Sequence, residues 1–254
     1  MKINVKKSLG QNFIFDKNIL NKISSFIKSN KDTTIIEVGP GPGTLTTYLQ
    51  QKSFKKLLLI EKDDRLIDNL NNEFQEKNIK IIHHDALNYN YQQSENNNSI
   101  IVGNLPFNIA TELLYIWTKI DNWPPVQTKM VLMFQKEVAN RIIAIPNNKS
   151  YGKLSVVMQS RYKIKKLLDV PAKVFSPPPK VDGTVLEFIP HNEFNSVHID
   201  KIDQIAKIAF SQRRKKIKNN LKDYFSILDR LEIDVNLRAE NLSVENYYSI
   251  ARLT

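Results

Sequence analysis

Residues 34–49 read TIIEVGPGPGTLTTYL, and the fold class of the chain can be inferred from them. The first five residues are mostly apolar, which is typical of a buried strand. Glycines at positions 39, 41 and 43 follow at once, and residues 44–49 continue with a helical pattern. A strand, a glycine turn and a helix in this order predict the start of a βαβ unit.

The alternation of strands and helices extends in both directions from this turn. Upstream, Asp16 is the expected N-cap of a helix whose apolar residues share one face. Downstream, helices are expected at 63–76, 108–118 and 135–143, and strands at 56–60, 79–82, 99–102, 129–134, 154–160 and 183–189. Such alternation predicts a doubly wound, mostly parallel sheet. Only a proline-rich connection lies between the last two strands, so an antiparallel end to the sheet is expected.

The pattern changes after Pro190, where only helical periodicity remains. We therefore expect two domains, one spanning residues 1–190 and a small, all-helical one spanning residues 191–254. The length of 254 residues, with 41% hydrophobic and 25% charged residues, is that of an ordinary globular chain. This composition excludes fibrous and wholly disordered classes.

The sequence does not indicate a membrane protein, a secreted protein or a metal-binding protein. No window approaches the roughly 18 consecutive apolar residues of a membrane span, and the basic start is not followed by the apolar segment of a secretory signal. A soluble, cytoplasmic protein is expected. There is no cysteine, and the adjacent His83 and His84 would face opposite sides of a strand, so no metal site is predicted.

The formal charge of +11 suggests a polyanionic partner, because a basic surface releases counterions from phosphates. The excess is uneven: residues 1–31 carry +6, residues 32–150 carry −1 and residues 151–254 carry +6. Since 29 of the 37 basic residues are lysine, a compositional bias of the source is the alternative explanation. The near-neutral middle favours real patterning.

Two acidic residues extend the glycine turn into a candidate cofactor site. Three glycines after a strand let the backbone approach a ligand closely, and Glu61 ends the second strand, where a carboxylate can take a ribose diol. Asp85 follows the third strand and can accept a hydrogen bond from an adenine amine, although such a residue is more often a helix cap. Thr44 stands where a dinucleotide fingerprint has its third glycine, which disfavours NAD. A glycine turn without any ligand remains the alternative.

The string Asn104-Leu105-Pro106-Phe107, directly after the fourth strand, indicates the reaction. An adenine N6 amine is a poor nucleophile because its lone pair is delocalised into the ring. A site that methylates it needs acceptors for both N6 hydrogens, and Asn104 Oδ1 and the Pro106 carbonyl can supply them. Phe107 offers a flat face on which an unpaired base can stack. The alternative is a loop whose asparagine caps the next helix.

The successive motifs of the chain resemble those of the ribosomal RNA adenine N6-dimethyltransferases. The resemblance rests on Gln11-Asn12-Phe13, residues 37–46 (EVGPGPGTLT), residues 104–107 (NLPF), residues 135–139 (QKEVA), residues 151–155 (YGKLS), residues 174–182 (VFSPPPKVD) and residues 238–243 (RAENLS). It implies a Rossmann-like class I methyltransferase with a seven-stranded sheet, and S-adenosylmethionine as cofactor. Phe107, where tyrosine is commoner, Ile14 and Gly183 are departures from the family pattern.

Within that family the chain resembles the bacterial small-subunit branch. This implies dimethylation of two adjacent adenosines in a hairpin loop near the 3′ end of 16S ribosomal RNA, within the small subunit or its precursor, coupled to subunit maturation. Alternatives are a ribosome-assembly or nucleic-acid-binding factor whose methylation is dispensable and, more distantly, a nicotinamide dehydrogenase. A monomer is the default expectation.

The resemblance also assigns roles to individual residues. Phe107 and Phe175 would flank the target base, and Asn104, Pro106 and Phe107 would form the catalytic loop. The predicted contacts to S-adenosylmethionine are Asn12, Ile14, Gly39, Glu61, Asp85 and Asn104.

Residues 209–219 (AFSQRRKKIKN) resemble the basic C-terminal helix of the small-subunit branch. From Lys207 to Lys222 there are seven basic residues and no acidic one, so the segment also reads as a phosphate-binding surface. A merely solvated helix face is the alternative. The predicted RNA contacts are Arg213, Arg214, Lys215, Lys216 and Lys218.

Overall fold

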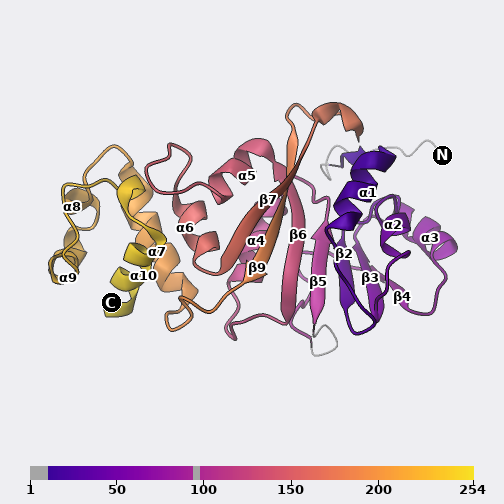
Figure 1. The fold of residues 1–254 in the computed structure, drawn as a ribbon, viewed down its shortest axis with the longest axis horizontal. Coiled ribbons are helices and arrows are strands. Elements are labelled where there is room, and N and C mark those ends of the chain that lie inside the picture. The colour runs from indigo at the N-terminus through magenta and orange to yellow at the C-terminus, as the bar shows by residue number, and fades with distance from the viewer. Residues whose placement is uncertain (1–10, 94–97) are drawn as a thin grey trace. The chain divides into compact units, whose positions relative to one another are not determined.

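The computed structural model describes residues 11–93 and 98–254. Seven strands form one sheet in the order β4-β3-β2-β5-β6-β9-β7 (Figure 1). Their bounds are β2 Thr34–Val38, β3 Lys56–Glu61, β4 Ile79–His83, β5 Ser99–Gly103, β6 Gln127–Gln135, β7 Tyr162–Val170 and β9 Gly183–Pro190. A separate two-stranded sheet joins β1 (Phe13–Ile14) to β8 (Phe175–Ser176) in antiparallel register.

The strand directions confirm the doubly wound, mostly parallel sheet. Strand β2 lies between β3 and β5 and is parallel to both, and β5 is parallel to β6. Strand β9 then runs antiparallel to β6, with Gln135 opposite Gly183. The expected antiparallel end is therefore present. Because β2, β3, β4 and β5 are all parallel, their carboxyl ends meet at one edge of the sheet, where open α/β sheets bind their ligands.

The helices that precede and follow these strands begin near the expected positions. They are α1 (Lys17–Ser25), α2 (Thr46–Leu49), α3 (Asp64–Glu73), α4 (Ala110–Thr118) and α5 (Lys136–Ile142). Asp16 caps α1, since its side chain accepts hydrogen bonds from the backbone N–H groups of Asn18 and Ile19 at 2.9 and 3.0 Å. A hydrophobic core joins α1, α2 and α3 to the sheet through Leu20, Ile23, Ile35, Leu49, Leu57 and Leu70.

The strand expected at 154–160 is wrong, because residues Lys153–Gln159 form helix α6. Its five consecutive residues 154–158 are all buried, and a short apolar run of that kind does not distinguish a buried strand from a buried helix. The missed strand is β7. It lies at the edge of the sheet and carries four charged side chains, as edge strands commonly do, so its sequence lacks an apolar run.

The chain forms two compact units. Among the described residues, the first comprises 11–93, 98–117, 125–136 and 165–189, and the second comprises 118–124, 137–164 and 190–254. The predicted boundary falls beside one of the crossings between the units, and the second unit also takes in helix α6. The second unit also holds α5 from residue 137 onward, and its remaining helices are α7 (Ile199–Ala209), α8 (Ile217–Asn220), α9 (Phe225–Arg230) and α10 (Val244–Leu253).

The basic segment is not one helix, which corrects that part of the sequence prediction. Helix α7 ends at Ala209, a single 3₁₀ turn covers Phe210–Gln212, and residues 213–216 form a turn before α8. The run of bases at 213–216 lacks apolar residues at helical spacing, so it has no apolar face that could pack against the protein and stabilise a helix.

Among the described residues, no helix combines the length and apolar character needed to cross a bilayer.

Candidate functional site

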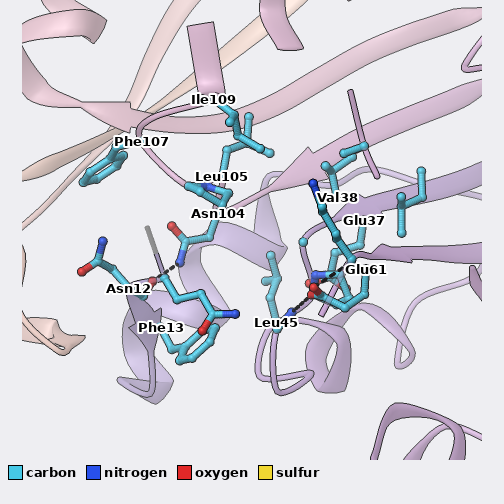
Figure 2. A pocket seen from close by; sticks show the side chains of 18 of the residues that line it. Asn12, Phe13, Glu37, Val38, Leu45, Glu61, Asn104, Leu105, Phe107 and Ile109 are labelled. Atoms are coloured by element: carbon cyan, nitrogen blue, oxygen red, sulfur yellow. Dashed lines mark hydrogen bonds between the residues drawn. The ribbon is translucent and has the colours of Figure 1, made fainter. Parts of the chain in front are cut away.

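A cavity opens at the carboxyl ends of the parallel strands of the first unit (Figure 2). The segment before β1, the glycine turn after β2, the end of β3, the loop after β4 and the loop after β5 all contribute to its lining. Every residue predicted to contact the cofactor lines this one cavity: Asn12, Ile14, Gly39, Glu61, Asp85 and Asn104. The predicted catalytic residues Pro106 and Phe107 line it as well. The sequence motifs thus converge on a single site, although contact with a cofactor stays a prediction.

The glycines of the turn serve two different purposes. Gly39, Gly41 and Gly43 have φ values of +66°, +58° and +80°, which side chains strongly disfavour. A Cβ on Gly41 would also lie 2.6 Å from the ring of Phe13, and one on Gly43 would lie 2.5 Å from Phe74. These two positions are therefore small for packing reasons.

Gly39 is different, because a Cβ there would meet nothing closer than Pro106 Cδ at 4.0 Å. Its side-chain position is open space in the wall of the cavity. The backbone is thus exposed at a point where a ligand can approach it closely, as the glycine turns of nucleotide sites allow.

Glu61 ends β3 with its carboxylate fixed by backbone donors. Oε1 accepts hydrogen bonds from the N–H groups of Lys62 and Asp63, both at 2.8 Å, and Oε2 accepts one from Gly41 at 3.1 Å. Burial of the side chain, which is 7% exposed, raises its pKa despite these three donors. Oε2 has only one of these donors, so it can accept a further hydrogen bond from a ligand hydroxyl in the cavity.

Asp85 follows β4 and is held by its neighbours. Oδ2 lies 2.6 Å from Nζ of Lys62, and Oδ1 accepts a hydrogen bond from the Leu87 N–H at 3.0 Å. The hydrogen bond from the Lys62 ammonium lowers the pKa of Asp85, so this carboxylate is ionised at neutral pH. A ligand amine that donates to Asp85 would therefore bond to an oxygen that already accepts a hydrogen bond from Lys62 or from Leu87.

Glu37 is a member of the site that the sequence analysis did not single out. It is the fourth residue of β2, is 2% exposed and lines the cavity. Its Oε2 accepts a hydrogen bond from the Thr46 hydroxyl at 2.7 Å, and burial raises its pKa to about 8. The sequence did contain an indication of this, because a carboxylate within an apolar strand, directly before a glycine turn, would not be expected unless it had a structural or functional role.

The loop after β5 holds Asn104 in a defined orientation. Its Nδ2 donates a hydrogen bond to the backbone carbonyl of Asn12 at 2.9 Å. Figure 2 shows the amide oxygen of Asn104 on the side that faces Phe107. This oxygen is the acceptor that the sequence analysis assigned to the target amine.

The predicted role of the Pro106 carbonyl needs correction. That oxygen already accepts hydrogen bonds from the N–H groups of Ile109 and Ala110, each at 3.1 Å, at the start of α4. Both of its lone pairs are thereby engaged. Among the described residues, no backbone donor bonds the carbonyl of Leu105 in the same loop.

Phe107 and Phe175 lie together in the first unit, but they do not form parallel walls. Their ring centroids are 6.4 Å apart and their planes are inclined by 63°, so a flat base cannot lie parallel to both. Phe175 is 3% exposed and belongs to the hydrophobic core, whereas Phe107 is half-buried at the cavity. In this arrangement a base could stack flat on only one of the two rings, and flanking by both stays a prediction.

The predicted RNA contacts lie in the second unit, and all five are exposed. Arg213, however, bonds within the protein. Its Nη2 donates to the carbonyls of Lys149 and Tyr151 at 2.8 and 2.7 Å and lies 3.3 Å from Glu240 Oε2.

The other predicted RNA contacts differ in how their side chains are held. Lys216 and Lys218 approach Asn236 Oδ1 at 3.2 and 3.5 Å. Arg214 and Lys215, by contrast, are exposed, and their side chains make no hydrogen bond to the other residues that the structure describes.

The chain is similar to known proteins along nearly its whole length. It is 40% identical over 258 residues to the ribosomal RNA small subunit methyltransferase A of Pelagibacter ubique, covering 99% of this chain and 97% of that protein. It is also 40% identical to the protein of that name from Brucella abortus, covering 97% of this chain and 91% of the other.

Solved structures support the fold. A dimethyladenosine transferase from Plasmodium falciparum superposes with a TM-score of 0.81 at 24% identity, over 94% of this chain and 95% of that one. The 23S rRNA methyltransferase ErmE superposes with a TM-score of 0.70 at 19% identity, over 95% and 98%. The family defined as ribosomal RNA adenine dimethylase matches residues 2–254. The chain therefore belongs to the ribosomal RNA adenine dimethylase family.

Proposed function

We propose that this protein transfers methyl groups from S-adenosylmethionine to the N6 amines of two adjacent adenosines in a hairpin loop near the 3′ end of 16S ribosomal RNA. The single observation that carries the proposal is the convergence of Gly39, Glu61, Asp85 and Asn104 on one cavity in a chain of this family. The protein acts as a cytoplasmic monomer on the small ribosomal subunit or its precursor, and the modification accompanies subunit maturation.

The hydrogen-bonding groups that line the cavity, and the open space beside Gly39, are suited to S-adenosylmethionine. Gly39 leaves backbone exposed where a side chain would otherwise fill the wall, and Glu61 offers an oriented carboxylate to a ribose diol. Asp85 takes the adenine amine, while Asn12, Ile14 and Asn104 line the remainder. When bound, this cofactor supplies an electrophilic sulfonium methyl group, and its positive charge is compatible with a cavity whose lining includes the ionised carboxylate of Asp85.

The residues of the loop after β5 act on the target adenine. Asn104 Oδ1 accepts one N6 hydrogen, and we assign the second to the carbonyl of Leu105 because that of Pro106 is already engaged. Two acceptors stabilise the positive charge that develops on N6 during in-line attack. Phe107 stacks on the flipped base, which is less costly to unstack from a loop than from a duplex. Pro106 stiffens the turn.

The RNA is held outside the cavity by basic side chains of the second unit. Arg214 and Lys215 are the proposed phosphate contacts, with Lys216 and Lys218 beside them, because their charges are exposed. Arg213 is a weaker candidate, because its Nη2 already has three intramolecular partners and a phosphate would have to bind its Nε or Nη1.

Two binding measurements separate the proposal from its alternatives. Isothermal titration calorimetry with S-adenosylmethionine and with NAD should show binding of the first only. A pure assembly factor would bind neither with useful affinity, and a dehydrogenase would bind NAD. Transfer of labelled methyl groups should then occur to small subunits that lack the modification, and not to large subunits. Labelling of large subunits alone would refute the proposed substrate.

A further inference from the structure

The orientation of the Asn104 side chain is fixed by a segment far away in the sequence. An asparagine amide can face either way, and its two orientations exchange an acceptor for a donor. Here Nδ2 is bonded to the Asn12 carbonyl, 92 residues earlier in the chain. The dashed line in Figure 2 joins the two residues, and the amide oxygen lies at the other end of the amide group.

The Asn12 carbonyl is itself held in place by contacts on both sides of it. On one side, Gln11 Nε2 donates a hydrogen bond to Asp63 Oδ2 at 2.9 Å. Asp63 is 2% exposed and is paired with Arg65, so it is a rigid partner. On the other side, Phe13 and Ile14 pair with β8. Asn12 therefore lies between two anchored residues.

The ring of Phe13 gives the segment a third attachment. It lies against the glycine turn, where a Cβ on Gly41 would come within 2.6 Å of it. The residues 11–14, which we call the N-terminal strap, thus contact the turn after β2, the segment after β3 and strand β8. A carbonyl held at so many points can orient a side chain.

We infer that the N-terminal strap is a positioning element that fixes the amide of Asn104 with its oxygen toward the target amine. This inference rests on the proposed function. In the opposite orientation, the NH₂ group of Asn104 would face the N6 hydrogens, donor against donor. The Asn12 carbonyl disfavours that orientation, because it would then face the amide oxygen. Asn12 acts here through its backbone, whatever its side chain does in the cavity.

The same geometry explains why residue 104 is asparagine and not aspartate. A carboxylate would offer an equally good acceptor to the target amine. Its second oxygen, however, would lie about where Nδ2 now lies, against the Asn12 carbonyl, and two acceptors repel. Only a protonated aspartic acid can both donate to the Asn12 carbonyl and accept from the amine.

The substitution Asn104→Asp tests this inference through its pH dependence. We would measure single-turnover methyl transfer at saturating cofactor and RNA from pH 6 to pH 9, and take the ratio of the variant rate to the wild-type rate. The ratio removes the titration of groups that both proteins share, such as Glu37, Glu61 and Asp85. The inference predicts a ratio that falls as pH rises, by about tenfold per pH unit once the pH exceeds the pKa of the new carboxyl group, because one proton must be bound to the variant side chain.

A ratio that is constant, or that rises with pH, would overturn the inference, because the ionised carboxylate would then function unaided. A merely structural role for Asn104 would lower the ratio equally at every pH. If the wild-type protein transfers no methyl group, the proposed function fails and the ratio cannot be formed. The positioning claim is then decided by a measurement on the protein alone.

That second measurement follows the side-chain NH₂ of Asn104 by NMR in protein labelled with ¹⁵N-asparagine. The resonance is assigned by its absence in the Asn104→Asp variant, or in Asn104→Ser if the former does not fold. Its hydrogen exchange should be at least tenfold slower than that of the exposed Asn71 side chain, and faster in Gln11→Ala. Exchange as fast as that of Asn71 would overturn the inference.

Discussion

The substitution Glu37→Gln offers a quantitative test of the electrostatics of the cavity. Burial raises the pKa of Glu37 from its ordinary value of 4.5 to about 8. The side chain therefore keeps a proton at pH 7 in the folded protein and loses it in the unfolded chain. Below pH 4.5 both states are protonated and the group has no effect. Between pH 4.5 and about 8, the unfolded state gains free energy from ionisation that the folded state does not, so stability falls as pH rises.

The size of this effect follows from the pKa shift. One pH unit corresponds to about 1.4 kcal/mol, so the loss of stability is about 3 kcal/mol at pH 7 and levels off near pH 8. Glutamine resembles the protonated glutamic acid, and its Oε1 can still accept the hydrogen bond from Thr46. The variant should thus avoid the loss and be more stable than the wild type, by less than about 1 kcal/mol at pH 5 and by about 3 kcal/mol at pH 7.

Urea denaturation of both proteins at pH 5, 7 and 8.5 measures the difference. The exposed Glu76 provides a matched control, because Glu76→Gln makes the same chemical change at a side chain that is already in solvent. A difference between Glu37→Gln and the wild type that does not change from pH 5 to pH 8.5 would show that Glu37 is ionised in the folded protein. The reasoning would then be refuted.

Three further substitutions test the cavity wall and the basic turn. Gly39→Ala should lower the free energy of unfolding by about 1–2 kcal/mol, because residue 39 has a positive φ. It should also weaken S-adenosylmethionine binding at least tenfold in calorimetry. Unchanged binding would mean that the cofactor does not approach the backbone at Gly39. Arg213→Ala should lower the unfolding temperature because three partners lose their donor, whereas Arg214→Ala should leave it unchanged and reduce the salt dependence of RNA binding by about one unit of slope. The reverse pattern would make Arg213 the phosphate contact.

The parts of the fold that sequence predicts well are those set by local chemistry. The glycine turn, the cap at Asp16 and the buried parallel strands each leave a pattern within a few residues. Strand β7 and helix α6 were not predicted correctly, because burial of five consecutive residues and the position of an edge strand depend on the rest of the fold. Neither fact is contained in a short window of sequence.

The candidate site shows the same division. Which motifs come together could be predicted, because parallel strands end at one edge of the sheet. Which atoms are free could not be predicted. The Pro106 carbonyl is engaged by the first turn of α4, and the guanidinium of Arg213 is held by carbonyls more than 60 residues away. Hydrogen bonds between residues so far apart in the sequence can be identified only in the folded chain. They determine whether a side chain is available to contact a ligand or is engaged in holding the protein together.

The most direct test of the central claim compares the wild-type protein with Asn104→Ala. Small ribosomal subunits that lack the modification are incubated with S-adenosylmethionine and each protein, and the 16S ribosomal RNA is digested for nucleoside mass spectrometry. The wild type should produce N6,N6-dimethyladenosine at two adjacent positions near the 3′ end. Asn104→Ala should bind the cofactor and lose at least a hundredfold in rate, in keeping with the loss of a preorganised hydrogen-bonding group. No dimethyladenosine with the wild type, or transfer by the variant within about tenfold of the wild-type rate, would contradict the account.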